Sequence, residues 1–148
     1  MKAPIGLIAA VAASVVLSAG TRATQSIPSI EVTAAWIRWL PAGVPSGGYM
    51  TLTNTGAASQ VLIGADSPEF GAVSVHHTDT RNGVSEMASV NSLLIKPHSS
   101  LQFAPGGYHL MLMQPKRALQ PGDHAPITLR FADGGSLQVS FEVRGADQ

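Results

Sequence analysis

Apolar and polar residues alternate along most of the chain beyond residue 29, which is the pattern of half-buried β-strands. In the segment 137–143 (LQVSFEV) the odd positions are apolar and the even positions are polar. Segments of this kind are short, and Gly, Pro, Asn and Asp separate them. The pattern predicts strands at 30–38, 48–53, 60–65, 72–78, 84–90, 93–95, 100–103, 108–113, 127–131 and 136–143.

No segment after the N-terminal region shows the apolar stripe of an amphipathic helix. About ten short strands separated by turn residues predict an all-β, antiparallel sandwich or barrel in a single domain. Asn54-Thr55-Gly56 predicts a turn, and Asp133-Gly134-Gly135 predicts a hairpin loop between the last two strands. The segments 42–47 and 114–124 are expected to be loops.

The first residues are typical of an export signal. Lys2 supplies a positive charge, and an apolar run of about 13 residues follows over 5–17. That run is short for a bilayer span, which needs about 20 residues, and small residues follow at Ala19 and Ala23. We therefore expect a signal peptide over 1–23, export to the periplasm, and a mature domain over 24–148. Because the sequence contains no Cys, we expect no lipid anchor on that residue.

Composition narrows the possible partners. The 148 residues are 45% hydrophobic and only 12% charged, with a formal net charge of zero. Nucleic-acid binding needs a basic surface, so nucleic acid is not an expected partner. The absence of Cys also means that any site for a soft metal must do without thiolate.

The His and Met residues gather in the second half of the chain. His76 and His77 end one predicted strand, and Met87 lies in the next. Later, alternation places three further residues on one face of a strand, with Leu110 and Leu112 on the other face. These three residues are His109, Met111 and Met113.

The side-chain chemistry of this group favours copper. Thioether sulfur is soft and prefers Cu(I), and imidazole binds copper in either oxidation state. Nearby carboxylates are few, Asp79 and Glu86, so a hard-cation site is not expected. Taken one at a time, a Met in an apolar strand is ordinary core, and His109 among apolar residues is an ordinary buried histidine. The joint pattern is what points to a metal.

The pattern is His76, ten residues, Met87, twenty-one residues, His109, one residue, Met111. It resembles the signature of the PCu(A)C family of periplasmic copper chaperones. The flanking segments are similar as well, namely PGGYHLMLM over 105–113, GYMTLTN over 48–54, and the final hairpin from Gly122-Asp123 to Asp133-Gly134-Gly135. The resemblance covers roughly residues 30 to 144.

The resemblance implies a cupredoxin-like β-barrel that binds one copper ion at an exposed edge through His76, Met87, His109 and Met111. It implies Cu(I) as the preferred ion, with Cu(II) possible, and delivery to the CuA centre of cytochrome c oxidase subunit II or to another periplasmic copper protein. A monomer without a small-molecule substrate is expected.

The chain departs from the family pattern at two positions. Ser85 stands where family members often carry the first Met of a Met-x-Met pair, and His77 stands where Glu or Met is common. His77 is therefore a candidate extra ligand that would favour the oxidised ion. Three further residues lie outside the signature and are expected to be structural or surface residues: Met113, His98 and His124.

Four other functions are alternatives to the chaperone. The first is general copper homeostasis without a dedicated oxidase target. The second is blue-copper electron transfer, which needs a Cys thiolate that this chain lacks. The third is a zinc hydrolase, but the sequence has neither HExxH nor a nucleophile elbow, so the protein is not expected to be an enzyme. The fourth is a β-sandwich binding module without metal.

Overall fold

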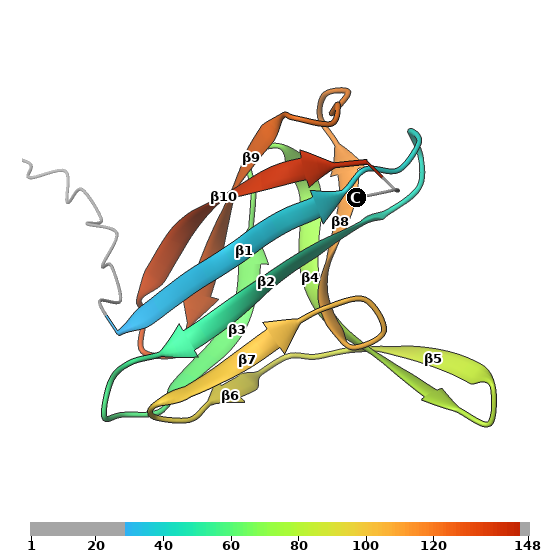
Figure 1. The fold of residues 1–148 in the computed structure, drawn as a ribbon. Helices are drawn as coiled ribbons and strands as arrows, with labels where there is room; N and C mark the ends of the chain where they lie inside the picture. The colour runs from blue at the N-terminus through green and yellow to red at the C-terminus, as the bar shows by residue number, and fades with distance from the viewer. Residues whose placement is uncertain (1–28, 146–148) are drawn as a thin grey trace, which may run out of the picture.

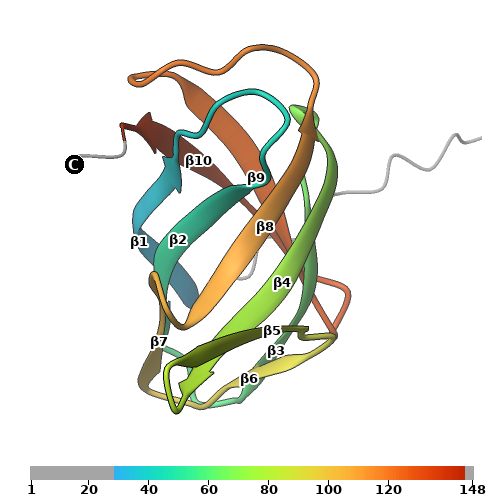
Figure 2. The ribbon, with the colours of Figure 1, turned by 90° about the vertical axis from the view of Figure 1, so that its right-hand side faces the viewer.

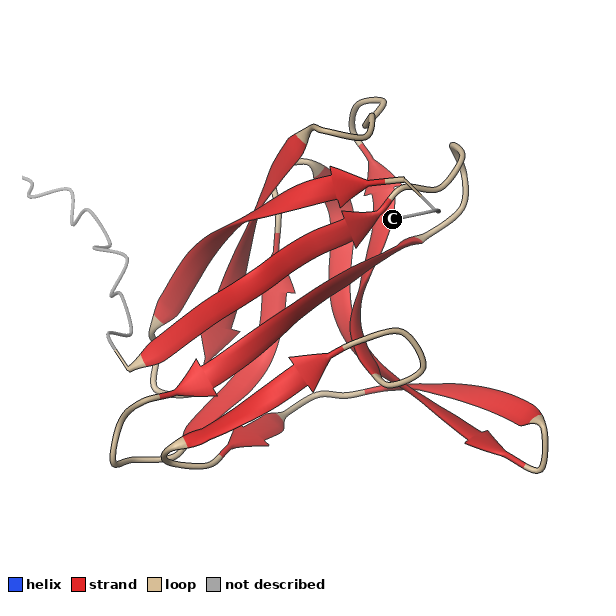
Figure 3. Cartoon of the chain, viewed as in Figure 1, coloured by secondary structure: helices blue, strands red, loops and turns tan. Residues whose placement is uncertain are grey.

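The computed structural model describes residues 29–145 as one domain built entirely from strands (Figure 3). The expected signal peptide over 1–23 lies outside these residues. None of the described residues forms a helix that would cross a membrane. The strands are β1 Ile30–Arg38, β2 Ser46–Asn54, β3 Gln60–Asp66, β4 Phe70–Arg81, β5 Val84–Ser89, β6 Leu93–Ile95, β7 Ser99–Phe103, β8 Tyr108–Pro115, β9 His124–Phe131 and β10 Ser136–Arg144.

These strands form a single ten-stranded sheet in the order β5-β4-β8-β7-β2-β1-β10-β9-β3-β6, with a further pairing of β8 and β2. Most neighbours are antiparallel, while β1 with β10 and β7 with β8 are parallel. The sheet coils on itself, so that β1, β2, β8 and β4 lie side by side along one wall (Figure 2). The predicted all-β, cupredoxin-like barrel in a single domain is confirmed.

The apolar residues of the alternating strands fill the inside of the coiled sheet. Apolar residues from nearly every strand are buried together, and the largest fully buried side chains include Phe131, Phe141, Leu110 and Leu112. Burying an aliphatic or aromatic side chain of this kind stabilises the fold by about 1.5–3 kcal/mol. Leu110 and Leu112 lie on the opposite face of β8 to His109 and Met111, as predicted, and the structure shows that the leucine face is the inner one. The odd-numbered residues of β8 are therefore on the outer side of the sheet.

Several predicted boundaries were wrong. β2 begins at Ser46 and β8 ends at Pro115, each inside a segment that was expected to be a loop. The strand predicted at 72–78 begins at Phe70 and continues to Arg81, because residues 76–81 pair with β5 across the turn Asn82-Gly83. Both turn residues have positive φ, 51° and 77°, which is the conformation of the tight hairpin turns that Asn-Gly favours. The resulting β4–β5 hairpin projects from the barrel (Figure 1), and every residue of β5 is exposed.

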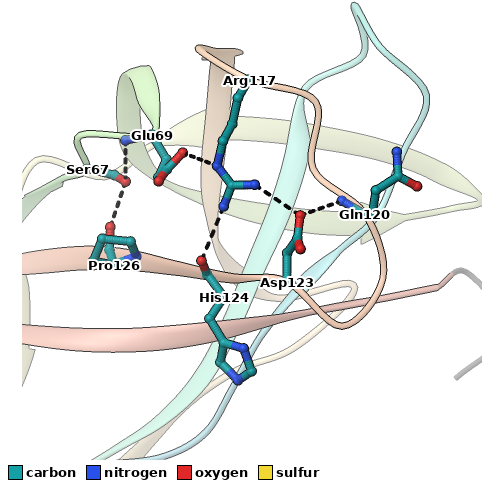
Figure 4. Close-up of polar contacts among 7 residues, drawn as sticks. All are labelled: Ser67, Glu69, Arg117, Gln120, Asp123, His124 and Pro126. Carbon is teal, nitrogen blue, oxygen red and sulfur yellow. Dashed lines mark hydrogen bonds and ion pairs between the residues drawn. The ribbon is translucent and has the colours of Figure 1, made fainter.

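The boundary of β9 was also wrong, because β9 begins at His124, within the segment expected to be a loop. A polar network fixes the end of that loop (Figure 4). Arg117 donates to carboxylates of Glu69 at 2.7 Å and Asp123 at 3.0 Å, and Asp123 also accepts from the backbone N–H of Gln120. The Gln120 hydrogen bond, followed by Arg117, lowers the pKa of Asp123. His124 contributes its carbonyl to Arg117, while its imidazole points away from the network (Figure 4).

Candidate metal centre

Three adjacent strands, β5, β4 and β8, carry the predicted ligand residues. In the β4–β8 ladder His76 lies directly opposite His109, and Ser74 lies opposite Met111. Side chains that face each other in an antiparallel ladder have Cβ atoms about 4.5–5.5 Å apart. The two imidazole rings accordingly stack, with centroids 5.8 Å apart and planes inclined by 28°. Residues 33 positions apart in the sequence are thus side by side.

Met87 reaches the same face from the other side of β4. It is paired with Thr78, and His76 is paired with Ser89, so Met87 is the diagonal neighbour of His76. Diagonal neighbours are about 7–8 Å apart at the backbone, within reach of a long side chain. The register therefore places His76, Met87, His109 and Met111 on one face around His76.

This face is the outer one, because Val75 and Leu110 of the same strands point into the core. Exposure differs greatly among the four residues. His109 is 8% exposed, whereas Met87 on the edge strand is 53% exposed. The side chains of His76, His109 and Met111 are thus at least partly buried in the sheet, whereas that of Met87 is open to solvent.

Hydrogen bonds decide which ring nitrogens are free. Nδ1 of His109 lies 3.2 Å from the carbonyl oxygen of Gly107. A carbonyl only accepts, so in the neutral ring Nδ1 carries the proton and Nε2 keeps the lone pair. Nε2 of His76 lies 2.9 Å from Oγ of Ser74, while Nδ1 of His76 is buried without a partner among the described residues.

Placing the His76 proton on Nδ1 would leave a buried N–H donor unpaired, which costs about 1–3 kcal/mol. The neutral ring is therefore assigned with Nε2–H donating to Ser74 and with a lone pair on Nδ1. Burial, and after it the neighbouring charge of His109, lowers the pKa of His76 below 6.5. His76 thus stays neutral near neutral pH, as a metal ligand must.

The other His and Met residues lie apart from these four. His77 faces the opposite side of β4, where its ring packs on Tyr108 at a centroid distance of 4.5 Å. Met113 shares the face of Met111 but is one step further along β8, opposite Ala72. His98 is exposed in the turn before β7 and has a φ of 52°. Ser85 makes a hydrogen bond of 2.9 Å with Thr80.

Sequence reasoning missed Ser74, which holds the His76 ring. The signal was available, because Ser74 is two residues from His76 and alternation puts both on one face. Among residues 29–145, no three His or carboxylate side chains are arranged so that they could hold a metal ion together. A metal at this face would therefore draw on the methionine sulfurs as well as the imidazoles, which is the donor set that suits Cu(I).

A cavity of about 340 Å³ lies at the other end of the barrel. It is enclosed mainly by apolar residues of the loops 39–46 and 115–120. None of His76, Met87, His109 and Met111 lines it. The candidate metal centre is therefore separate from this cavity.

Comparison with known proteins places these observations in a family. The model of the family described as "LpqE-like: Putative lipoprotein LpqE-like" matches residues 30–143. The "Putative lipoprotein Lxx21020" of Leifsonia xyli subsp. xyli is 34% identical over 116 residues, which are 78% of this chain and 69% of that protein.

Solved structures are similar over most of the chain. The solution structure of CuI-DR1885 from Deinococcus radiodurans is 31% identical, covers 85% of each chain and has a TM-score of 0.65. The copper-bound PCuAC domain from PmoF2 is 24% identical, covers 81% of this chain and 96% of its own, and has a TM-score of 0.68. The second likeness is evidence of a common fold.

Proposed function

The chain belongs to the LpqE-like family and has the fold of the PCu(A)C domains, and on that premise we propose that it is an exported copper chaperone. In this proposal it carries one Cu(I) ion in the periplasm and delivers it to the CuA centre of cytochrome c oxidase. It performs no turnover of its own. The solved relative CuI-DR1885, by its description, is a Cu(I) form, which supports the choice of ion.

One observation carries the proposal: two imidazoles and two thioethers share one outer face, and each imidazole keeps a lone pair. We assign Nδ1 of His76, Nε2 of His109 and the sulfurs of Met87 and Met111 as the copper-binding atoms. The two thioethers carry no proton, and each imidazole would bind copper through its lone pair. A cargo site needs such exchangeable ligands, and it also needs an open side, which the exposed Met87 provides.

X-ray absorption on the Cu(I)-loaded protein tests the ligand set. We expect one copper per chain with two sulfur and two nitrogen neighbours. A spectrum with nitrogen and oxygen neighbours alone would contradict the assignment, because the methionines would then take no part.

Transfer of Cu(I) to a soluble apo CuA domain tests the proposed destination of the copper. A loaded protein that retains its copper in the presence of that domain would point to general copper homeostasis instead.

Ser74 gives a second, independent test. In Ser74→Ala the His76 ring loses the acceptor that holds its Nε2–H, so both neutral tautomers become populated. Loss of a partner behind a metal ligand typically weakens binding by about 10–100-fold, and we expect a Cu(I) affinity loss in that range. Imidazole ¹⁵N NMR of the apo protein reports the tautomer directly.

Ser85→Ala is the matched control for this change, because Ser85 lies on the same face and bonds only Thr80. It should leave both the His76 tautomer and the Cu(I) affinity at wild-type values. An unchanged tautomer in Ser74→Ala would show that the hydrogen bond does not orient the ring.

A further inference from the structure

Next to the ligand face, on the same outer side of the sheet, lies a row of large side chains. We call Trp36, Arg38, Tyr49 and Arg144 the aromatic–arginine belt. Trp36 pairs with Tyr49 across β1 and β2, and Arg38 pairs with Arg144 across β1 and β10. Strands β1, β2, β8 and β4 run side by side (Figure 2), so the belt lies beside the ligand residues on one face of the sheet. Tyr49 is itself only 7% exposed, and Trp36 and Arg38 pack against it.

A β-bulge turns the belt outward. Between the pairs Thr33–Thr51 and Trp36–Tyr49, β1 contains one residue more than β2, and Ala34 there has a φ of 51°. The extra residue shifts the alternation, so Trp36 and Arg38 face out while Ile37 is buried. Bulges commonly re-aim side chains beside functional sites. Without the bulge, Trp36 would point inward.

A glycine brings the belt to the ligands. Gly47 of β2 lies directly opposite Met111 of β8. A Cβ atom on Gly47 would lie 2.5 Å from Oη of Tyr49, so the Tyr49 ring lies over Gly47 in the space that a side chain would fill. The phenol end of Tyr49 therefore borders the position of Met111.

The belt is held in shape by its own contacts. The rings of Trp36 and Tyr49 are 4.7 Å apart between centroids. The Arg38 guanidinium carbon lies 5.7 Å from the Tyr49 centroid and 6.0 Å from that of Trp36, and the Arg144 carbon lies 5.8 Å from Trp36. Trp, Tyr and Arg are the residue types that most often dominate protein–protein binding energy. A pre-arranged set of them loses little entropy on binding.

The charge on this side of the site is positive. Glu142 pairs with Arg144 at 3.0 Å, whereas no carboxylate of residues 29–145 forms an ion pair with Arg38. The hairpin also carries two carboxylates, Asp79 and Glu86, which are opposite each other in the β4–β5 ladder. Both lie on the other face of the hairpin from Met87. The belt therefore offers a net positive charge immediately beside the ligands.

From these contacts we propose that the aromatic–arginine belt is the docking surface for the protein that receives the copper, and that this partner presents acidic side chains beside its own copper ligands. The inference rests on the proposed chaperone function. Ligand exchange requires the two copper sites to come into contact, so the surface that borders the donor site must lie in the interface. Opposite charge on the partner steers such encounters and fixes their orientation.

The test is the rate of Cu(I) transfer from the full chain to a soluble apo CuA domain. We expect the double variant Arg38→Gln/Arg144→Gln to lower the second-order rate by about tenfold at low ionic strength. We also expect it to flatten the salt dependence of that rate while Cu(I) affinity and Tm stay at wild-type values. Arg38→Lys/Arg144→Lys keeps the charge and should retain the salt dependence.

Arg130→Gln is the control for a general loss of charge, because Arg130 is an exposed residue of β9 paired with Asp66. It should transfer copper at the wild-type rate. If the Arg38→Gln/Arg144→Gln variant transfers copper as fast as the wild type, the proposed docking surface is wrong, while the proposed chaperone function is unaffected. Absence of transfer from the wild type would overturn delivery to this acceptor, and the docking surface with it.

Discussion

Replacing both Met87 and Met111 with Leu should abolish tight Cu(I) binding. Each change removes a sulfur from the proposed donor set and leaves the two histidines, which alone cannot complete a four-ligand site. Loss of a mere outer partner costs about 10–100-fold in metal affinity, so we expect each single variant to lose more than about 100-fold and the double variant more than either. Competition with a chromophoric Cu(I) chelator measures the change.

The Met→Leu change is a sharp probe because it preserves volume. Such swaps usually cost less than about 1.5 kcal/mol of stability, and Met87 is exposed in any case. Met50→Leu is the matched control, since Met50 is buried in the core away from the ligand face. Met113→Leu asks whether the next sulfur on β8 contributes, and we expect wild-type affinity. Wild-type affinity in the Met87→Leu/Met111→Leu variant would refute the proposed site.

The second large effect is on stability and comes from Leu110→Ala. Leu110 lies between His109 and Met111 in the sequence, but it is fully buried on the inner side of β8. Truncating a buried Leu costs about 3–5 kcal/mol, because lost burial and a residual cavity both count. Chemical denaturation of the apo protein should show a loss of this size. Leu94→Ala, the same change at an exposed position of β6, should stay within about 0.5 kcal/mol of wild type.

Measuring the free energy of unfolding with and without copper distinguishes a loss of core packing in Leu110→Ala from damage to the proposed metal site. A ligand that binds only the folded state, at a free concentration a thousand times its Kd, adds about 4 kcal/mol of stability. Because Leu110 faces away from the ligands, we expect the loaded-minus-apo difference to be the same in Leu110→Ala and in the wild type to within about 1 kcal/mol. A much smaller difference in the variant would mean that the inner side of β8 sets the ligand positions.

Much of this architecture was predictable because alternation is local. Each of the ten strands was predicted close to its observed place, and the outward direction of His109 and Met111 follows from the burial of Leu110. The extension of β4 was missed although Asn82-Gly83 is a strong hairpin signal. The opposite directions of His76 and His77 were predictable too, because neighbouring side chains in a strand point to opposite faces.

What the sequence did not supply is the pairing of distant strands. That His76 faces His109 depends on the register of β4 with β8, which is set by packing of the whole barrel rather than by nearby residues. The spacing pattern identified the ligand candidates only through resemblance to a family. The effects of Gly47 on Tyr49 and of the bulge at Ala34 on Trp36 could not be predicted either, because both depend on the pairing of β1, β2 and β8.

The projecting β4–β5 hairpin has a consequence for how such a site diverges during evolution. His109 and Met111 flank a core residue, so the positions of these two proposed donors are tied to the stability of the barrel. The side chains of β5 are all exposed, and substitutions there change the free energy of unfolding by little. Proposed donor groups on β5, such as Met87, can therefore be exchanged at little cost to folding, so the metal preference of the proposed site can change there while the barrel is unaffected.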